Sequence, residues 1–211
     1  VFSEMLGELS DTTVITDVGS TKQHVIAAAK EVFGEVPAQF VPGHPIAGTE
    51  KTGVEASFAG LFHNRRIILT PLSHTHKNAI ATITKMWQLT GAKVDQVSID
   101  HHDQVLAATS HLPHMLAFSL VDTLAKMDDK AKIFQFAAGG FRDFTRIASS
   151  DPKMWHDICL TNSDELLRVI AEFRDGLDLL TQAIDKNDGA ALLDIFTRAK
   201  NARDRFTEQT S

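Results

Sequence analysis

The stretch TTVITDVGSTKQHVIAAAKEVF, residues 12–33, decides the fold of this chain. Its β-branched start, residues 12–18, predicts a buried strand, and residues 22–33 predict the helix that follows. The same alternation continues along the chain, with strands expected at 39–42, 66–71 and 93–98 and a helix at 78–90. Because strands separated by helices need crossover connections, we expect a mostly parallel sheet covered by helices, as in a doubly wound α/β domain.

The strand signals stop near residue 100, and the remainder of the chain is predicted to be all-helical. We therefore expect an α/β domain over residues 1–99 and a helical domain over residues 100–211. The helical signals are a long pattern at 103–126, a glycine loop at 138–140, and helix starts at Asp151-Pro152, at Asn162 with Glu165, and at Asp188.

An apolar seam runs along the last two predicted helices. It is formed by Leu166, Ile170, Phe173, Leu177, Leu180 and Ile184, and it continues with Leu192, Phe196 and Ala199. A seam of this length needs a cover, either from neighbouring helices or from a second subunit. Because the helical half is small for a self-sufficient core, we expect a homodimer formed through these helices.

Composition argues against several classes of protein. Hydrophobic residues make up 43% and charged residues 23% of the 211 residues, as in ordinary globular proteins. The net charge of −6 gives no basic field for nucleic acid, and no apolar run reaches the roughly 20 residues that cross a bilayer. The single cysteine, Cys159, rules out an internal disulfide and fits a reducing compartment, so we expect a cytoplasmic protein.

Two polar groups follow the first two predicted strands. Ser20 lies in the turn where doubly wound sheets bind their ligands, although capping of the next helix also explains it. His44, between Gly43 and Pro45, suits a proton acceptor because the unperturbed pKa of imidazole lies near 6.5; the alternative is a turn histidine without a chemical role. Since the ends of neighbouring parallel strands lie about 5–10 Å apart, Ser20 and His44 together favour a site.

A third polar cluster lies in the predicted helix at 103–126. Four of its residues share one helical face, which either lines a pocket or faces water. They are Asp103, Ala107, Ser110 and His114. His111 and His114 stand three residues apart, but no glutamate lies between them and no third ligand has the usual spacing, so we expect no metal site.

The fourth cluster follows the glycine loop. Arg142 and Arg146 stand four residues apart with aromatic residues between them, but acidic neighbours argue against a nucleic-acid surface. An arginine beside a glycine loop can hold a carboxylate with two parallel hydrogen bonds, and a surface ion pair of little energy is the alternative. Trp155, further along, is by default a core or interface residue.

Four stretches together resemble the prephenate/arogenate (cyclohexadienyl) dehydrogenase family, and they occur in the order found in that family. They are DVGSTK at 17–22, GHPIAGTE at 43–50, SHLPH at 110–114 and GFRDFTRIA at 140–148. The resemblance covers about residues 11–185. It implies a Rossmann-type domain that binds NAD or NADP, followed by an all-helical dimerisation domain. It also implies the oxidative decarboxylation of prephenate or arogenate in tyrosine biosynthesis.

The same resemblance implies roles for individual residues. His44 is expected to accept the proton of the substrate's ring hydroxyl, with Ser20 holding both groups in line. Arg146 is expected to bind the substrate carboxylate, with Asp103 as its electrostatic partner. Further substrate contacts are implied for Ser110, His114, the gating acid Glu50, and Trp155, which would reach the pocket across the dimer. Cofactor contacts are implied for Asp17, Val18, Ser20 and Pro45.

One family feature has no counterpart in this sequence. A Gly-x-Gly-x-x-Gly turn is expected roughly 80 or more residues before Asp17, whereas the residues before Asp17 contain one glycine, Gly7. We therefore expect a doubly wound domain whose N-terminal part is missing. Two alternatives stay open. One is a catalytically inactive helical dimerisation module, and the other is a related β-hydroxyacid dehydrogenase, which typically relies on a helical-domain lysine that the face from Asp103 to His114 lacks.

Overall fold

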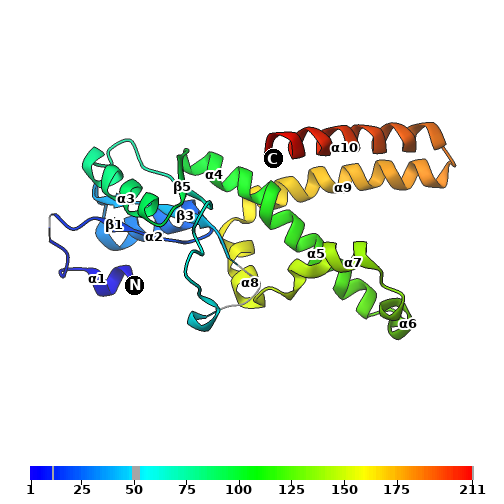
Figure 1. Cartoon of the computed structure of the whole chain (residues 1–211), viewed down its shortest axis with the longest axis horizontal. Helices are drawn as coiled ribbons and strands as arrows, with labels where there is room; N and C mark the ends of the chain where they lie inside the picture. Colours follow the sequence, from blue (N-terminus) through cyan, green and yellow to red (C-terminus); the bar gives the residue numbers. More distant parts are fainter. Residues whose placement is uncertain (11, 49–52, 211) are drawn as a thin grey trace. The chain divides into compact units, whose positions relative to one another are not determined.

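The computed structural model describes residues 1–10, 12–48 and 53–210, with side chains described as far as residue 207. The chain divides into two compact units, Val1–Leu166 and Leu167–Ser211. The first unit contains the strands and the helices up to α8, and the second contains most of α9 and all of α10 (Figure 1).

The α/β part of the first unit follows the predicted alternation closely. Its elements are α1 (Phe2–Met5), β1 (Ile15–Thr16), α2 (Lys22–Phe33), β2 (Phe40–Val41), β3 (Gly43–Ile46), η1 (Val54–Ala56), β4 (Arg66–Leu69), α3 (Lys77–Leu89) and β5 (Lys93–Gln96). The bounds expected for α2 are confirmed, and those of α3 shift by one residue at each end. The first strand is much shorter than the predicted 12–18.

The strands form two small sheets, ordered β1-β2 and β3-β4-β5. β1 is parallel to β2, and β4 is parallel to β5, as expected. β3, however, is antiparallel to β4, with His44 opposite Ile68. This third pairing differs from the mostly parallel sheet because a parallel crossover usually contains an α-helix, and the described part of the segment from β3 to β4 contains only the short η1.

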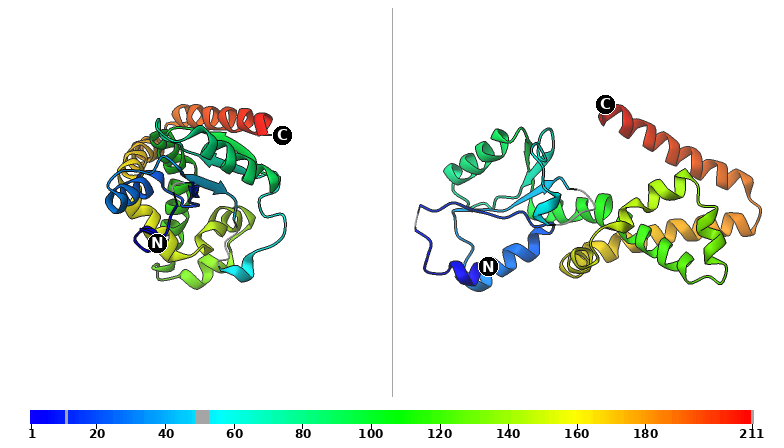
Figure 2. Two further views of the ribbon diagram at one scale, coloured as in Figure 1. Left: turned by 90° about the vertical axis from the view of Figure 1, so that its left-hand side faces the viewer. Right: turned by 60° about the horizontal axis from the view of Figure 1, so that its bottom comes forward.

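Two hydrophobic clusters lie on opposite faces of the strands. Phe40 of β2 packs with Ile15 and Ala29 on the side of α2. Its neighbour Val41 points the other way and packs with Ile83 and Trp87, among others, on the side of α3. Figure 2 shows α2 and α3 on the two sides of the strands. The α/β part is therefore a Rossmann-like layered domain with small sheets.

The rest of the chain is helical, as predicted. Its elements are α4 (Ile99–Leu106), the π-helical segment η2 (Ala107–His111), α5 (Leu112–Ala125), α6 (Lys130–Gln135), α7 (Gly139–Thr145), the 3₁₀ segment η3 (Arg146–Ser149), α8 (Pro152–Thr161), α9 (Ser163–Asp185) and α10 (Gly189–Thr210).

Two local predictions for the helices are wrong, and two are confirmed. The single helix at 103–126 is interrupted by η2, and the glycines at 139–140 begin α7 instead of forming a loop. The Asp151 carboxylate accepts a hydrogen bond from the Met154 N–H at 2.8 Å and so caps α8. Asp188 caps α10 in the same way, accepting from the Ala191 N–H at 3.0 Å.

In the second unit, α9 and α10 carry the predicted apolar seam, and much of it is exposed. Leu177 is 50% exposed, Ile184 63% and Phe196 57%. Much of the seam is therefore left exposed among the described residues, as the sequence suggested. Among the described residues, no helix is both long and apolar enough to cross a membrane.

Candidate active site

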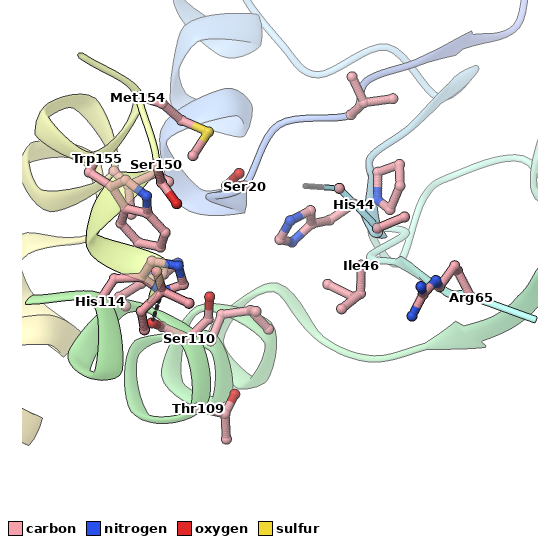
Figure 3. A pocket seen from close by; sticks show the side chains of 18 of the residues that line it. Ser20, His44, Ile46, Arg65, Thr109, Ser110, His114, Ser150, Met154 and Trp155 are labelled. Carbon is pink, nitrogen blue, oxygen red and sulfur yellow. Dashed lines mark hydrogen bonds between the residues drawn. The ribbon is translucent and has the colours of Figure 1, made fainter. Parts of the chain in front are cut away.

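One cleft of about 710 Å³ in the first unit contains most of the side chains that the sequence singled out. From the strand side it is lined by Val18, Ser20, His44 and Pro45. From the helical side it is lined by Ser110, His111, His114, Arg146 and Trp155. Figure 3 shows His44 and Ser20 on one wall, and His114 stacked with Trp155 on the other. The structure thus brings His44 and Arg146 into one cavity.

The parallel pairing of β1 with β2 brings Ser20 and His44 together. Thr16, which ends β1, lies opposite Val41, which ends β2, so both strands deliver the chain to the same edge. Ser20 follows β1 by four residues, and His44 follows β2 by three. The ligand-binding edge expected for a doubly wound sheet is therefore where these two side chains lie. His44 is in strand β3, not in the turn that was considered as an alternative.

A buried ion pair fixes the backbone on both sides of this edge. The Lys22 ammonium is fully buried and donates to the Asp17 carboxylate at 2.5 Å and to the Gly43 carbonyl at 2.6 Å. The other Asp17 oxygen accepts from the Gly43 N–H at 3.0 Å. A Cβ atom on Gly43 would lie 3.1 Å from the Asp17 carbonyl oxygen, so a side chain there would crowd the backbone of Asp17. This network fixes both the N–H and the carbonyl group of Gly43, the residue before His44.

The described contacts of Asp17 are internal, and its expected cofactor contact stays a prediction. Asp17 is not among the residues that line the cleft, and its carboxylate is held by Gly19, Lys22 and Gly43. The reason is the buried Lys22 ammonium, which needs a nearby anion. Burial lowers the pKa of Lys22, and the Asp17 carboxylate opposes that change by stabilising the charged form.

Asp103 also has different partners from those expected. Its carboxylate lies at the N-terminus of α2, where it accepts hydrogen bonds from the N–H groups of Lys22 at 2.9 Å and Gln23 at 2.8 Å. It caps this helix in place of Ser20, because free N–H groups and the helix dipole favour an anion there. The described hydrogen bonds of its carboxylate are to Lys22, Gln23 and His102, and the electrostatic pairing with Arg146 stays a prediction.

A chain of hydrogen bonds leads from Asp103 to His44. The Asp103 carboxylate lies 2.7 Å from Nδ1 of His102, and Nε2 of His102 lies 2.9 Å from Nδ1 of His44. His102 and Asp103 are almost completely inaccessible, at 0% and 1%, whereas His44 is 9% exposed and borders the cleft. His102 thus connects a carboxylate outside the cleft lining to the imidazole at its wall, a contact that the sequence did not indicate.

Burial dominates the electrostatics of these groups. It lowers the pKa of His44 to about 3, and His102, Lys22 and His111 act in the same direction. Burial alone would raise the pKa of Asp103, but the hydrogen bonds from His102, Gln23 and Lys22 outweigh it, so the pKa of this carboxyl is lowered. At neutral pH the site therefore contains a neutral His44 and an ionised Asp103.

The π-helical segment η2 shapes the helical wall of the cleft. A π turn adds a residue to the helix, and such turns occur frequently at functional sites. Here Ser110 and His111 from η2, and His114 from α5, all reach the cleft. Nδ1 of His114 lies 2.8 Å from the carbonyl oxygen of Ser110, so this nitrogen donates and the ring is held in place.

An aromatic stack forms the floor beside these residues. The rings of Trp155 and His114 stack at a centroid distance of 3.7 Å, and Trp155 meets His111 edge to face at 6.0 Å. His111 is in turn held by the Asn162 side chain, 3.2 Å from its Nδ1, which also donates to the Asp103 carbonyl. The expected reach of Trp155 across a dimer is therefore wrong: it lines the cleft of its own chain. The Asn162 side chain therefore bonds to His111 and to the Asp103 carbonyl instead of forming the predicted capping box.

Of the remaining predicted residues, one lines the cleft, one does not, and one lies outside the described residues. Arg146 begins η3 and lines the cleft, whereas Arg142 does not line it. Glu50 lies outside the described residues. Sequence reasoning missed Arg65, which enters the cleft from the strand side (Figure 3), and the buried His111. Over the described residues, no group of three His, Cys, Asp or Glu side chains is arranged to hold a metal ion.

The arrangement has a clear chemical capability. A neutral imidazole on one wall can accept a proton, and a guanidinium in the same cleft can bind a carboxylate. The same cleft is lined by Trp155 and by apolar side chains, which suit a planar ring. This combination fits proton removal from a small cyclic acid.

Comparisons with known proteins agree with this picture. The family model of the prephenate dehydrogenase nucleotide-binding domain matches residues 1–96, and that of the prephenate dehydrogenase dimerization domain matches residues 98–198. The chain is 41% identical over 206 residues to cyclohexadienyl dehydrogenase of Zymomonas mobilis, covering 96% of this chain and 69% of that protein. It is also 41% identical over 206 residues to prephenate dehydrogenase of Bacillus subtilis, and this match covers 95% of this chain and 55% of that protein.

A solved structure is similar over the same extent. The chain superposes with a TM-score of 0.88 and 37% identity on the crystal structure of prephenate dehydrogenase from A. aeolicus in complex with hydroxyphenyl propionate and NAD+. The match covers 97% of this chain and 71% of that one.

Proposed function

Because the chain belongs to the prephenate dehydrogenase family, we propose that it oxidises prephenate or arogenate with NAD+ or NADP+ and releases the ring carboxylate as carbon dioxide. This reaction is a step of tyrosine biosynthesis. The observation that carries the proposal for this chain is that His44 and Arg146 line one cleft.

His44 is the proton acceptor in this proposal. The substrate's ring hydroxyl becomes a carbonyl as the adjacent carbon loses its hydride, so the hydroxyl proton must pass to a base in the same step. A neutral imidazole at the cleft wall fits this task, and burial keeps His44 neutral by lowering its pKa to about 3. Ser20, on the same wall, is suited to hydrogen-bond the hydroxyl and hold it toward His44.

Arg146 is the binding group for the substrate carboxylate. A carboxylate that enters a partly closed cleft loses water, and a guanidinium compensates that loss with two parallel hydrogen bonds. Ser110 and His114, beside it on the helical wall, offer further polar contacts above the Trp155 ring. Loss of the ring carboxylate yields an aromatic ring, so the protein mainly supplies position and a proton acceptor.

The residues present fit a nicotinamide at the strand edge. When bound, the oxidised nicotinamide supplies the hydride acceptor. Val18 is 61% exposed beside Ser20 and Pro45 at the end of β1, and it gives the flat ring an apolar surface where doubly wound folds bind dinucleotides. These three residues would hold the nicotinamide end. Asp17 acts behind them by fixing the loop.

The two alternatives left open by the sequence are not favoured. A dimerisation module without catalysis has no need for a cleft that gathers a base, a guanidinium and an aromatic floor. A β-hydroxyacid dehydrogenase typically uses a helical-domain lysine, and among the described residues that line the cleft there is no lysine.

The test is the activity of the purified protein and of its His44→Asn variant. Prephenate or arogenate should give reduced nicotinamide, detected by its fluorescence. The variant should lose about 10²–10⁴-fold in turnover, because the proton acceptor is gone, with little change in the Michaelis constant. Binding of 4-hydroxyphenylpropionate, measured by calorimetry, serves as the control that the variant's cleft is intact. Unchanged turnover in the variant would remove His44 from the mechanism.

We further propose a homodimer formed through the helical part. It is supported by the match to a dimerization-domain model and by the exposed apolar side chains of α9 and α10. The boundary between the two functional domains near residue 99 and the cytoplasmic location also belong to this proposal. The boundary is supported by the last strand, which ends at Gln96, and the location by the single cysteine.

A further inference from the structure

We propose that His102 and Asp103 are positioning residues that hold the proton of neutral His44 on Nδ1, and that His102 takes over this proton when His44 accepts one from the substrate. The inference rests on the proposed function for its second half only. Its first half, the position of a proton in the resting protein, follows from the hydrogen-bond partners alone.

The direction of each hydrogen bond follows from Asp103. Backbone N–H groups can only donate, and those of Lys22 and Gln23 point at the two Asp103 oxygens, at 2.9 and 2.8 Å. Both oxygens are therefore acceptors, and the hydrogen bonds that lower the pKa of this carboxyl keep it ionised at neutral pH. The third neighbour, Nδ1 of His102 at 2.7 Å, must then carry a proton and donate it.

The assignment then passes along the chain of rings. A neutral imidazole that carries its proton on Nδ1 has only an acceptor on Nε2. Nε2 of His102 lies 2.9 Å from Nδ1 of His44, so the latter must donate. The remaining nitrogen of His44, Nε2, therefore has a lone pair, and His44 is the member of the chain that lines the cleft. This is the tautomer that a proton acceptor needs.

The same contacts give the accepted proton a destination. When Nε2 of His44 takes the hydroxyl proton, the Nδ1 proton of His44 can pass to Nε2 of His102. His44 is then neutral again with its proton on Nε2, and His102 is a cation that still donates from Nδ1 to Asp103. One proton enters the chain and one positive charge results, placed 2.7 Å from the Asp103 carboxylate.

The surrounding charges favour this destination over His44. Lys22 from α2 and His111 from η2 disfavour a cation on His44. Burial does not favour His102, since this ring is 0% exposed and His44 is 9% exposed. His102 has the Asp103 carboxylate as its direct partner, whereas His44 reaches that carboxylate only through His102. A cation is therefore better stabilised one ring further from the cleft.

The resting tautomer can be tested without any turnover. Long-range proton–nitrogen NMR spectra of protein labelled with ¹⁵N-histidine distinguish a proton on Nδ1 from one on Nε2. The His44 signals are identified by their loss in His44→Asn. We expect the His44 and His102 rings to carry their protons on Nδ1 at pH 8, and a His44 proton on Nε2 would overturn the inference. An inactive protein with the Nδ1 proton would contradict the proposed function alone.

Two variants of His102 separate its two tasks. In His102→Gln, the side-chain carbonyl can reach the place of Nε2 and accept from His44, but it cannot take up a proton. In His102→Leu both properties are lost. We expect turnover to fall about 10–100-fold in His102→Gln and further in His102→Leu, with Michaelis constants within about threefold of the original.

The pH profile gives a readout that a packing role would not change. A proton added to the resting pair removes the lone pair of His44 that faces the cleft. The acid limb of kcat/KM therefore belongs to the pair, and it should shift to lower pH in His102→Gln. The matched control is His101→Gln at the exposed neighbouring position. A His102→Gln protein with the original turnover and acid limb would show that His102 only fills space.

Discussion

The Lys22 ammonium donates to the carbonyl oxygen of Gly43 at 2.6 Å, one residue before the imidazole that lines the cleft. Lys22 is in the first turn of α2, which follows β1, and Gly43 begins β3. This bond therefore connects the helix after a strand of the first sheet to a strand of the second sheet. Asp17 completes the tie from the loop after β1. The DVGSTK stretch therefore positions His44 through buried charges, in addition to presenting Ser20 to the cleft.

Replacing Lys22 by methionine should be strongly destabilising. The substitution keeps the length of the side chain but leaves the Asp17 carboxylate without its cation, and breaking a buried ion pair in this way costs about 3–5 kcal/mol. Urea unfolding followed by circular dichroism measures the loss. The Lys22→Met/Asp17→Asn double variant should recover part of it, because the orphan charge is removed. A single variant as stable as the original protein would show that the pair contributes no net stability.

Replacing Arg146 by alanine should chiefly weaken substrate binding. A hydrogen bond to a charged group contributes about 1.5–3 kcal/mol, which corresponds to an increase of about 10–100-fold in the Michaelis constant, with a smaller effect on turnover. Steady-state kinetics with prephenate and with arogenate measure both quantities. Arg142→Ala is the matched control, because Arg142 is a neighbouring exposed arginine that does not line the cleft. Equal Michaelis constants for both variants and the original would contradict the role of Arg146.

The sequence predicted the local elements well because their signals are local. Periodicity identified α2 and α3 almost to the residue, and Asp151 and Asp188 marked helix starts that their side chains indeed cap. The expected parallel pairing of two neighbouring strands predicted that Ser20 and His44 lie at the same edge, because this pairing alone brings the ends of both strands together. Features that depend on neighbouring residues or on regular backbone pairing can thus be predicted from the sequence.

What the sequence could not predict depends on contacts between distant residues. The partners of Asp103 lie about 80 positions earlier, at the start of α2, so a helical face gave no hint of them. The π segment η2 changes the helical phase after Leu106, which a regular period of 3.6 residues does not anticipate. His102 precedes this segment and was overlooked because it lies beside the chosen polar face, yet its Nε2 lies 2.9 Å from Nδ1 of His44.

The protein should lose stability as the pH falls from about 7 toward 5. Burial lowers the pKa of His44 to about 3 and that of His111 to about 4, whereas both titrate near 6.5 in the unfolded chain. Below pH 6.5 the unfolded state therefore binds protons that the folded state refuses, and stability declines until the folded-state pKa is reached. At pH 5 each of these histidines costs about 2 kcal/mol relative to pH 7.5.

Urea unfolding at a series of pH values checks this dependence. His111→Asn should reduce the slope of the unfolding free energy against pH by the contribution of one titrating group, because asparagine does not titrate. The asparagine carbonyl can still accept a hydrogen bond from Asn162, so the packing contact is kept. His101→Asn, at an exposed position, is the control and should leave the slope unchanged. A slope that is the same in all three proteins would show that His111 is not the source.

The apolar seam of the second unit should hold two chains together. Leu177 and Phe196 are half exposed or more within one chain, so a glutamate at both positions disrupts little inside it but places two anions in an apolar interface. Sedimentation should show twice the chain mass of 23.2 kDa for the original protein and a single chain for Leu177→Glu/Phe196→Glu. The dimer dissociation constant should rise by about 100-fold or more. Asp178→Lys, an exposed polar position beside Leu177, should remain dimeric, since it changes charge without entering the seam. If the double glutamate variant sediments like the original protein, the seam is not the dimer interface.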